Sequence, residues 1–559
     1  MTSKRTFRIV LGLVVLCLLS LSVVVYLHRA LTPVQAKLLA VNDFHGQLQP
    51  QGKRDRAGGA AFLVGGLKAA QKGMEGKTVI VLAGDTVGAS PADSALLHDE
   101  PAIMVFNSLA NAACLDDKKD PRCNMVSTLG NHEFDKGQAE LARQINGGNA
   151  PDGPFLENPW RGAAYPYVCA NVVYAASGKT LLPPYVIKKI GNIPVAFIGA
   201  VVKGTPNASL PANVAGLKFL DEAEAINSYV PALRAKGIRA IVAVIHQGGN
   251  QEEYAGPTDT AKPSVEGPIV SITRRLDPEV DIVISGHTHK FTNAYVKNAG
   301  GRDVLVTQAW VKGTAFADID MVLDPTSGDI IQKSAKIVPV NAQTPSDAGV
   351  ETLVTQADTR VAPLVNRSVG QAKIAITREE NPAGESGLGD LVADAFRRAT
   401  GTDFAFMNPG GIRNDLPQGP ITWGSLFACL PFGNDLVTMQ LTGDQLYAVL
   451  AQQWSRPAMP RMLQISGLNY VWTEHGQGKP GTIDAIYRND GTPIDRTARY
   501  SVTVNSFLAA GGDAFTVFAA GTDSVERETT EVEALRLAIE AQPSPVPPVL
   551  DRITRKQSK

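Results

Sequence analysis

Five short motifs that contain histidine, aspartate or asparagine constrain this chain more than any other feature. The chain has eight histidines, and five of them lie in the motifs. Each motif follows an apolar run of the kind that forms a β-strand. Polar side chains at several strand ends predict an α/β layered fold with one site at those ends. The motifs are Asn42-Asp43-Phe44-His45-Gly46, Gly84-Asp85, Gly130-Asn131-His132-Glu133-Phe134-Asp135, Ile245-His246 and Gly286-His287-Thr288-His289.

The residue types in these motifs indicate a metal site. Mixed carboxylate, amide and imidazole donors suit zinc, manganese or another transition metal rather than calcium. In an extended segment residues i and i+2 share a face, so Asp43 with His45, and His287 with His289, are expected to point into one site. Two such pairs can surround two ions. The five cysteines form no CxxC pair, so cysteine is not expected among the ligands.

The chain divides into segments that predict two domains, as its length of 559 residues also suggests. Short β-branched runs alternate with mixed segments over residues 37–340, which predicts an α/β domain. A polar, turn-rich stretch with a helix-start signal predicts a linker helix over residues 341–367. A second α/β domain, with a helix at Leu388–Thr400, is expected over residues 368–554. The strand-like runs of the first domain include Thr78–Leu82, Val195–Val202, Ala240–Ile245 and Asp281–Ile284.

Residues 1–36 predict export. Lys4, Arg5 and Arg8 precede an uncharged apolar run over residues 9–27, which as a helix is about as long as the ~30 Å hydrocarbon core of a membrane. An uncleaved anchor is favoured, and a signal peptide cleaved after Val34-Gln35-Ala36 is the alternative. The positive flank places residues 37–559 outside the cytoplasm, in the periplasm or another extracytoplasmic space.

Charge and cysteine placement limit the partners. A net charge of −1 provides no basic field for a nucleic acid polymer, so any phosphate binding is expected to be local. Cys114 and Cys123 lie nine residues apart in a polar loop. An oxidising compartment can join them, or they are two unrelated thiols, and the sequence does not decide between these alternatives. The sequence also gives no indication of an oligomeric state.

In this order, the motifs D-x-H, G-D, G-N-H-E, a single histidine and G-H-T-H resemble the calcineurin-like metallophosphoesterase family. The resemblance implies a four-layer αββα domain that holds two divalent ions, and a metal-bound hydroxide as nucleophile. It implies that Asp85 bridges the two ions. One ion would be held by Asp43, His45, Asp85 and His289, and the other by Asp85, Asn131, His246 and His287.

His132 and Asp135 form a candidate catalytic pair. In the family that the motifs resemble, such a pair orients the imidazole toward the phosphoryl and leaving oxygens. A carboxylate partner fixes the ring and favours its protonated form, which can stabilise negative charge or donate a proton. The alternative is that Asp135 caps the next helix.

Four motifs in the second half resemble the C-terminal domain of the 5′-nucleotidases and UDP-sugar hydrolases. They are Glu385-Ser386-Gly387-Leu388-Gly389-Asp390-Leu391, Asn408-Pro409-Gly410-Gly411-Ile412-Arg413, Leu430-Pro431-Phe432-Gly433-Asn434 and Asn505-Ser506-Phe507-Leu508-Ala509-Ala510-Gly511-Gly512-Asp513. One departure is Pro409, which stands where the family has glycine and so removes a backbone donor.

The second resemblance implies a nucleotide site. Phe432 and Phe507 would sandwich the base, and Arg413 would bind phosphate, unless it pairs with Asp415 or Asp390 instead. Each phenylalanine taken alone is more often a core residue. The full set of substrate-binding candidates is Asn408, Gly411, Arg413, Phe432, Phe507 and Asp513, with Arg378 as a further arginine.

Together the two resemblances imply hydrolysis of nucleoside 5′-monophosphates to nucleoside and phosphate. Cleavage of 2′,3′-cyclic nucleotides or of UDP-sugars uses the same metal core and stays open as an alternative. A surface binding protein without catalysis is a more remote alternative, because the ligand set is intact.

Overall fold

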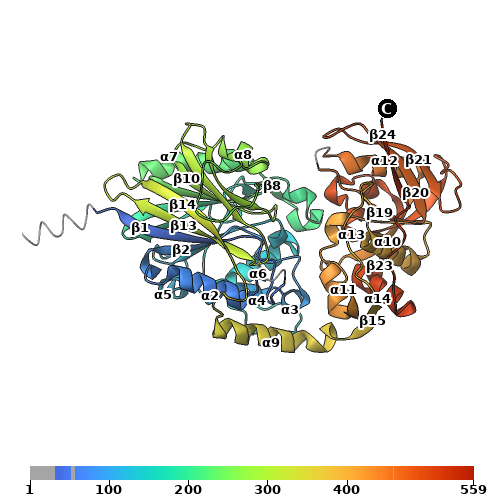
Figure 1. The fold of residues 1–559 in the computed structure, drawn as a ribbon, viewed down its shortest axis with the longest axis horizontal. Coiled ribbons are helices and arrows are strands. Elements are labelled where there is room, and N and C mark those ends of the chain that lie inside the picture. The colour runs from blue at the N-terminus through green and yellow to red at the C-terminus, as the bar shows by residue number, and fades with distance from the viewer. Residues whose placement is uncertain (1–31, 52–56, 457–458, 559) are drawn as a thin grey trace, which may run out of the picture.

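The structure is a computed structural model that describes residues 32–51, 57–456 and 459–558 (Figure 1). The predicted membrane anchor at residues 9–27 lies outside the described residues. Across the described ranges, no helix has the length and apolar character that crossing a membrane requires. The alternative cleavage motif, Val34-Gln35-Ala36, forms the start of strand β1 (Val34–Val41) and pairs with β13 (Ala315–Leu323). Cleavage after Ala36 would therefore remove paired residues from a sheet.

Two six-stranded sheets pack face to face in the N-terminal domain. Their strand orders are β14-β13-β1-β2-β3-β4 and β11-β12-β10-β9-β7-β6. Leu38 and Val81 of the first sheet meet Val242 and Ile284 of the second in a shared apolar core. The remaining strands of these two sheets are β2 (Thr78–Leu82), β3 (Met125–Thr128), β4 (Tyr167–Val168), β6 (Tyr185–Ile190), β7 (Ile193–Val201), β9 (Ala240–His246), β10 (Val280–Ser285), β11 (Phe291–Lys297), β12 (Asp303–Ala309) and β14 (Ile330–Pro339).

Helices cover the outer faces of both sheets. Alternate residues of β1 point to opposite faces, so Leu39 packs on the outer side, against α2 (Ala60–Gln71) and α4 (Glu100–Asn107). On the other sheet, α7 (Glu222–Ala235) and α8 (Pro268–Thr273) pack against the outer face. The predicted four-layer αββα arrangement is confirmed. The predicted bounds of the four strands agree with the observed bounds within two residues. Interior parallel strands are buried on both faces, so they are continuous apolar runs that are easy to recognise in a sequence.

Helix α9 (Ala348–Val365) connects the two domains and runs along the lower side of the molecule in Figure 1. Asp347 caps it by accepting a hydrogen bond from the backbone N–H of Val350 at 3.0 Å. The helix packs against α2 and α3 (Ala92–Ala95) of the first domain and against α11 (Trp423–Cys429) of the second. A linker helix is therefore present within residues 341–367, although the domain boundaries themselves stay a prediction.

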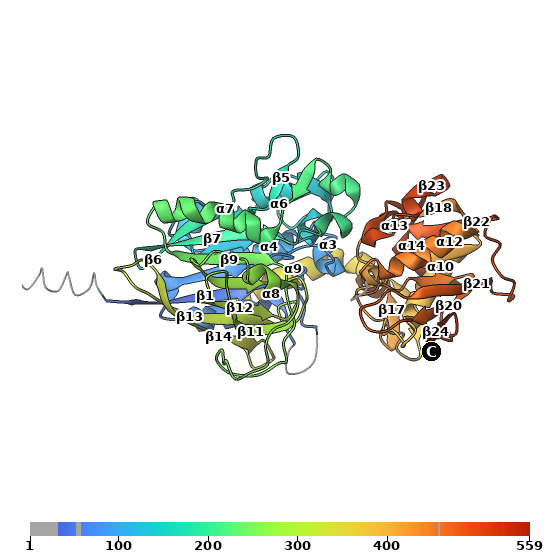
Figure 2. The ribbon, with the colours of Figure 1, turned by 90° about the horizontal axis from the view of Figure 1, so that it is seen from above.

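The C-terminal domain has a five-stranded sheet of order β19-β16-β22-β18-β23 and two smaller sheets (Figure 2). Helix α10 (Gly387–Thr400) packs on one face of the larger sheet, where Ala405 and Met407 point, while Phe404 and Phe406 fill the core on the other face. The strands are β15 (Ser368–Ala372), β16 (Phe404–Met407), β17 (Gly419–Thr422), β18 (Asp435–Thr442), β19 (Gln464–Ser466), β20 (Leu468–Glu474), β21 (Thr482–Arg488), β22 (Arg499–Asn505), β23 (Thr522–Thr530) and β24 (Ile553–Gln557).

Cys114 and Cys123 are joined by a disulfide, which decides between the two alternatives that the sequence leaves open. Cys114 lies in the short helix α5 (Ala112–Asp116). Cys169 and Cys429 are buried thiols without a disulfide partner.

Asp93 makes the stability of the fold depend on pH. It lies in α3 against the linker helix, and its Oδ1 atom is buried without a hydrogen-bond partner. Burial, together with the charge of Asp358, raises the pKa of Asp93 to about 7. Because an unfolded aspartate titrates near ~4, the folded protein binds an extra proton between these values and loses stability as the pH rises from about 4 to about 7.

We expect Asp93→Asn to flatten this part of the pH dependence, because the amide does not titrate. Up to ~4 kcal/mol of the difference in unfolding free energy between about pH 4 and pH 8 should disappear. Urea denaturation at a series of pH values measures it, with Asp116→Asn, an exposed aspartate, as the control. An unchanged slope in the Asp93 variant would mean that this carboxyl does not titrate in the window.

Candidate metal centre and adjoining pocket

The predicted metal-ligating residues lie at or just after the carboxyl ends of neighbouring strands. In the first sheet β1, β2 and β3 are neighbours, and in the second β9 and β10 are neighbours. The two sheets therefore bring residues from distant parts of the chain to one edge. These residues are Asp43 and His45 after β1, Asp85 after β2, Asn131 after β3, His246 at the end of β9, and His287 and His289 after β10.

The backbone at most of these residues is not extended, so one expectation is wrong. The chain leaves β1 at Val41 and β10 at Ser285, and both D-x-H and H-T-H lie in the turns that follow. The two pairs converge because tight turns redirect both side chains, and not because they share a face of a strand. Such conformations cost about 1–3 kcal/mol each and cluster at functional sites. Positive φ angles between 49° and 73° occur at Asp43, His45, Asp85, His287 and His289.

The ligand atoms form two groups that share Asp85. Asp43, His45, Asp85 and His289 make one group, and Asp85, His246 and His287 make the other; within each group the ligand atoms lie within 4.8 Å of one another. Asn131 joins the second group, because its Oδ1 lies 2.9 Å from His287 Nδ1. His45 Nε2 and His289 Nε2 are 3.1 Å apart. The structure therefore brings the predicted ligand residues together in two groups, and their role as ligands stays a prediction.

The chemistry of this cluster fits divalent cations. His246 Nε2 is fully buried without a well-directed hydrogen bond, yet it lies 3.0 Å from Asp85 Oδ2. Burial would lower the pKa of His246, but the Asp85 and Asp43 carboxylates raise it to about 10. Burial would likewise raise the pKa of Asp85, but His246 and His132 hold it well below its usual range. The cluster therefore favours positive charge at its centre.

Backbone carbonyls orient the histidine rings. His45 Nδ1 lies 2.9 Å from the carbonyl oxygen of Gly88, and His246 Nδ1 lies 2.7 Å from that of Ala83. With Nδ1 as donor to these carbonyl oxygens, Nε2 of each ring faces the cluster, and such hydrogen bonds usually fix the orientation of metal-binding histidines. Gly130 lets the backbone after β3 lie close to Asp85, because a Cβ atom at residue 130 would lie 2.1 Å from Asp85 Oδ1.

Glu133 is a further residue of the site that the sequence did not single out. Its buried carboxylate accepts hydrogen bonds from the backbone N–H groups of Asp85 and Thr86, at 3.0 and 2.8 Å, and from that of Gly130. It therefore holds the turn after β2 against the turn after β3. Its position inside the G-N-H-E motif was the available signal, since a carboxylate buried among loops must find donors.

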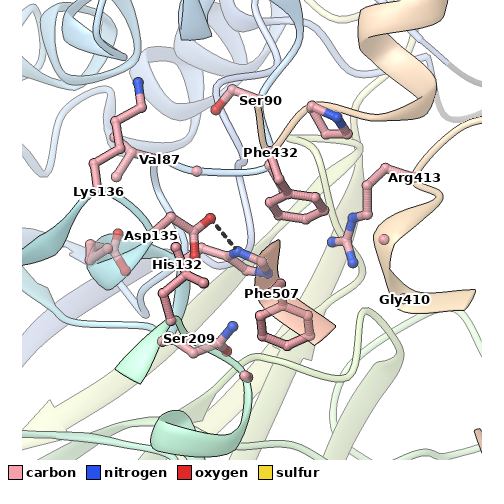
Figure 3. A pocket seen from close by; sticks show the side chains of 18 of the residues that line it. Val87, Ser90, His132, Asp135, Lys136, Ser209, Gly410, Arg413, Phe432 and Phe507 are labelled. Atoms are coloured by element: carbon pink, nitrogen blue, oxygen red, sulfur yellow. Dashed lines mark hydrogen bonds and ion pairs between the residues drawn. The ribbon is translucent and has the colours of Figure 1, made fainter. Parts of the chain in front are cut away.

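His132 and Asp135 form the predicted pair. His132 Nδ1 lies 2.7 Å from Asp135 Oδ2, drawn as the dashed line in Figure 3. Burial would lower the pKa of His132, but the carboxylates of Asp135 and Asp85 raise it above its usual value. The next helix, α6 (Gly137–Asn146), has Lys136 at its N-cap and no side-chain cap. The alternative that Asp135 caps that helix is therefore wrong.

A pocket of about 230 Å³ lies between the two domains beside this pair (Figure 3). The ring of Phe432 stacks on His132 with centroids 5.9 Å apart, and the guanidinium of Arg413 lies 5.9 Å from the Phe432 centroid. Phe507 packs so closely on Gly512 that a Cβ atom there would lie 2.5 Å from its ring. The pocket lining includes Asn131, His132, Asp135, His287, Asn408, Gly411, Arg413, Phe432, Phe507 and Asp513.

Arg413 is free to meet an anion. Among the described residues it has no ion pair with a carboxylate, since Asp415 accepts from the backbone N–H of Arg378 and Asp390 lies beside Arg552. Burial is the largest cause that lowers the pKa of Arg413. The predicted alternative, a pair with Asp415 or Asp390, does not form.

Asp513 and Arg378 differ from the other substrate-binding candidates in the residues that they contact. Asp513 accepts a hydrogen bond from Asn408 Nδ2 at 3.0 Å and pairs with Arg461, which lines the pocket and which sequence reasoning missed. Arg378 donates to the carbonyl oxygen of Ile412 at 3.1 Å and lines a separate hollow behind the Asn408–Arg413 loop. Pro409 starts a short 3₁₀ turn there and leaves Gly411 and Arg413 facing the pocket.

Comparison with known families agrees with this geometry. Residues 36–291 match the calcineurin-like phosphoesterase family, and residues 368–520 match the 5′-nucleotidase C-terminal domain. Fold and site thus define the class of two-domain metallophosphoesterases. The chain therefore has the domain pair of the 5′-nucleotidase family.

Individual relatives cover the chain in different ways. The "Endonuclease YhcR" of Bacillus subtilis is 33% identical over 85% of this chain, and the "Cell wall protein Lmo0130" of Listeria monocytogenes is 34% identical over 88% of it. The chain spans only 37% and 65% of the length of these two proteins. The solved structure of a 5′-nucleotidase precursor from Thermus thermophilus has a TM-score of 0.76 and 27% identity, and the match covers 93% of this chain and 99% of that one.

Proposed function

We propose that this protein hydrolyses nucleoside 5′-monophosphates to nucleoside and phosphate, with two divalent metal ions, outside the cytoplasmic membrane. The observation that carries the proposal is the pocket between the domains, because it joins His132 to Phe432 and Arg413. One domain contributes the metal cluster and an imidazole, and the other contributes aromatic faces and a guanidinium. The likeness to a structure described as a 5′-nucleotidase precursor supports the same assignment.

The proposed ions are zinc, manganese or another transition metal, which the donor set suits. Bound there, they would lower the pKa of a water molecule and offset the charge of an in-line displacement at phosphorus. We assign Asp43, His45, Asp85 and His289 to one ion, and Asp85, Asn131, His246 and His287 to the other.

The chain's own residues hold and protonate the substrate. Asp135 accepts from His132 Nδ1, so the Nε2–H of the same ring is available to the 5′ oxygen as it leaves. The guanidinium of Arg413 can bind two phosphate oxygens in a fork. The base lies between Phe432 and Phe507, with Asn408 and Asp513 beside the nucleoside.

Removal of the Phe507 ring should weaken base binding selectively. Stacking on one aromatic ring contributes ~1–3 kcal/mol, so Phe507→Ala is expected to raise the KM for AMP roughly 5- to 150-fold. Ribose 5-phosphate lacks the base, so its kcat/KM should not change. Steady-state phosphate release measures both, with Phe155→Leu, outside the pocket, as the control variant. An equal loss for both substrates would show that Phe507 supports the fold instead of the base.

The proposed location outside the cytoplasmic membrane rests on three observations. These are the basic and apolar N-terminal run, the Cys114–Cys123 disulfide, and a relative named as a cell wall protein. Intact cells that express the full chain should therefore hydrolyse AMP added to the medium. Activity that appears only after lysis would contradict export.

A substrate panel tests the proposed activity. Hydrolysis of AMP, UMP, UDP-glucose and 2′,3′-cyclic AMP is measured by chromatography of the products, along with cleavage of a single-stranded oligonucleotide, which is included because one relative is named an endonuclease. A chelator-sensitive preference for the monophosphates is expected. Preference for the cyclic nucleotide or UDP-glucose would replace the substrate assignment, and oligonucleotide cleavage would contradict the expectation of no nucleic acid partner. No turnover with any metal would favour a binding protein without catalysis.

A further inference from the structure

We propose that Glu531 is a positioning residue for the base of the substrate, and that it holds the segment of Phe432 and the segment of Phe507 in one fixed arrangement. The inference rests on the proposed function, because it concerns how the pocket presents its two aromatic rings to a base. Phe432 and Phe507 both line the pocket (Figure 3), whereas Glu531 is absent from the lining and acts through its neighbours.

Glu531 lies at an edge of the larger C-terminal sheet where three neighbouring strands meet. In the order β22-β18-β23, strand β22 ends at Asn505, β18 begins at Asp435 and β23 ends at Thr530. Both pairs of strands are antiparallel, so these three ends lie at one edge of the sheet. Glu531 follows β23 as the first residue of helix α14 (Glu531–Ala541) and is fully buried. One side chain can therefore contact all three strand ends.

The carboxylate of Glu531 binds the loop that carries Phe432. Asn434 Nδ2 donates to both carboxylate oxygens of Glu531, at 3.2 and 3.3 Å. The backbone N–H of Glu531 donates to the carbonyl oxygen of Asn434 at 2.9 Å, so the backbone and the side chain hold the same residue. Asn434 follows Phe432 and Gly433 directly and itself lines the pocket. Glu531 thus fixes the point at which the Phe432 loop enters β18.

The same carboxylate binds the segment that carries Phe507. Asn505 Nδ2 donates to Glu531 Oε2 at 3.4 Å, and Asn505 Oδ1 accepts from the backbone N–H of Leu508 at 2.9 Å. The second of these hydrogen bonds caps the short helix α13 (Ser506–Ala509), in which Phe507 lies. Because Oδ1 of Asn505 accepts from the helix, its Nδ2 faces Glu531. The carboxylate therefore holds the start of α13 through Asn505.

Two further hydrogen bonds complete the network around the pocket. Ser506 Oγ donates to Asn434 Oδ1 at 3.3 Å, which joins α13 directly to the Phe432 loop. Asn505 Nδ2 also donates to Asn408 Oδ1 at 3.2 Å, and Asn408 is one of the polar residues that line the pocket. The network therefore connects both aromatic segments with a polar residue of the pocket.

A buried carboxylate whose partners are amides is costly to keep. Across the described ranges, no lysine, arginine or histidine forms an ion pair with Glu531. Burial raises the pKa of Glu531 to about 7, although the hydrogen bonds from Asn434 and Asn505 lower it. An apolar side chain of similar size would avoid the cost of desolvation, but it would leave the two amides without this acceptor. The contacts therefore favour a role in arranging the pocket segments over a role in stability alone.

Glu531→Gln tests this role, because the amide keeps the shape but replaces one acceptor oxygen with a donor that faces the donors of Asn434 and Asn505. We expect the KM for AMP to rise about five- to thirtyfold, part of the effect of losing a stacking ring, with kcat nearly unchanged. The kcat/KM for ribose 5-phosphate, which lacks the base, should not change. Glu533→Gln, on the same helix and outside the pocket, is the matched control.

A double-mutant cycle with Phe507→Ala separates positioning from a general loss of stability. In the Phe507→Ala background, Glu531→Gln should raise the KM for AMP by a clearly smaller factor than in the unmodified chain, because one of the two rings that it positions is gone. A purely structural role for Glu531 would give the same factor in both backgrounds.

Three results would overturn the proposal: an equal factor in both backgrounds, an equal loss for AMP and ribose 5-phosphate, or an unchanged KM for AMP. If thermal unfolding shows that Glu531→Gln does not fold, Ser506→Ala carries the same cycle, because it removes the hydrogen bond to Asn434 without changing a buried charge. It should raise the KM for AMP about two- to tenfold. Failure of the proposed function is a different observation, since it would appear as absence of AMP hydrolysis by the unmodified chain.

Discussion

Asp85→Asn is expected to lower kcat/KM for AMP at least about a thousandfold, or ~4 kcal/mol of transition-state stabilisation. Asp85 belongs to both groups of candidate ligands, and its side chain is buried. Its Oδ2 lies 3.0 Å from His246 Nε2, and its Oδ1 accepts from the backbone N–H of His132 at 2.9 Å. The amide keeps the shape and removes the charge at the point where both ions are proposed to meet.

Metal content separates this explanation from a general loss of folding. We expect Asp85→Asn to retain less metal than the unmodified protein when both are analysed by atomic emission. Asp281→Asn is the control, because Asp281 is a buried aspartate of the same domain that pairs with Lys333 and lies outside the cluster. It should keep its metal and its activity. An Asp85 variant with normal metal content and normal turnover would refute the bridging assignment.

His132→Ala is expected to lower kcat for AMP roughly 10²–10⁴-fold, the usual contribution of a positioned general acid. His132 is not in either ligand group, but it lies at the junction of cluster and pocket, with Asp135 on one side and Phe432 on the other. Its loss should therefore remove proton donation and leave the metal content unchanged. Asp135→Asn should reduce kcat less, because the imidazole remains. It is only less firmly oriented and less readily protonated.

Leaving-group dependence identifies the role of His132 directly. A p-nitrophenyl phosphate substrate has a good leaving group and needs no proton, so His132→Ala should affect its hydrolysis much less than that of AMP. His475→Ala, an exposed histidine of the second domain, is the control. If the His132 variant lost metal along with activity, the residue would be a ligand instead of an acid.

Much of the fold and of the candidate metal cluster was predictable because local signals and chemistry agree. The strands that lead into the cluster are apolar runs buried on both faces, as β2 shows, and a metal-binding side chain lies at the end of each strand or within a few residues after it. Asp43, Asp85 and His287 can be recognised as potential metal ligands without knowledge of contacts distant in the sequence. The sequence did mislead on backbone conformation, because an alternating D-x-H pattern is also compatible with a turn of positive φ.

The residues that were missed act through contacts distant in the sequence. Lys312 donates a hydrogen bond to Asn414 of the other domain, and Arg461 pairs with Asp513. Neither lies in a motif, and a lysine or arginine taken alone is usually an exposed charge. Arg378, in contrast, lies near a matching motif, yet its side chain lines a hollow outside the pocket. Only the packed structure of the two domains shows which contacts these three residues make.

The most direct test of the account is metal titration of the chelator-treated protein with AMP as substrate. We predict no phosphate release from the metal-free protein, and recovery of activity that is complete only when about two equivalents of manganese or zinc are bound. Unchanged hydrolysis of AMP after the metal has been removed would contradict the central claim, and so would full recovery at a single bound ion.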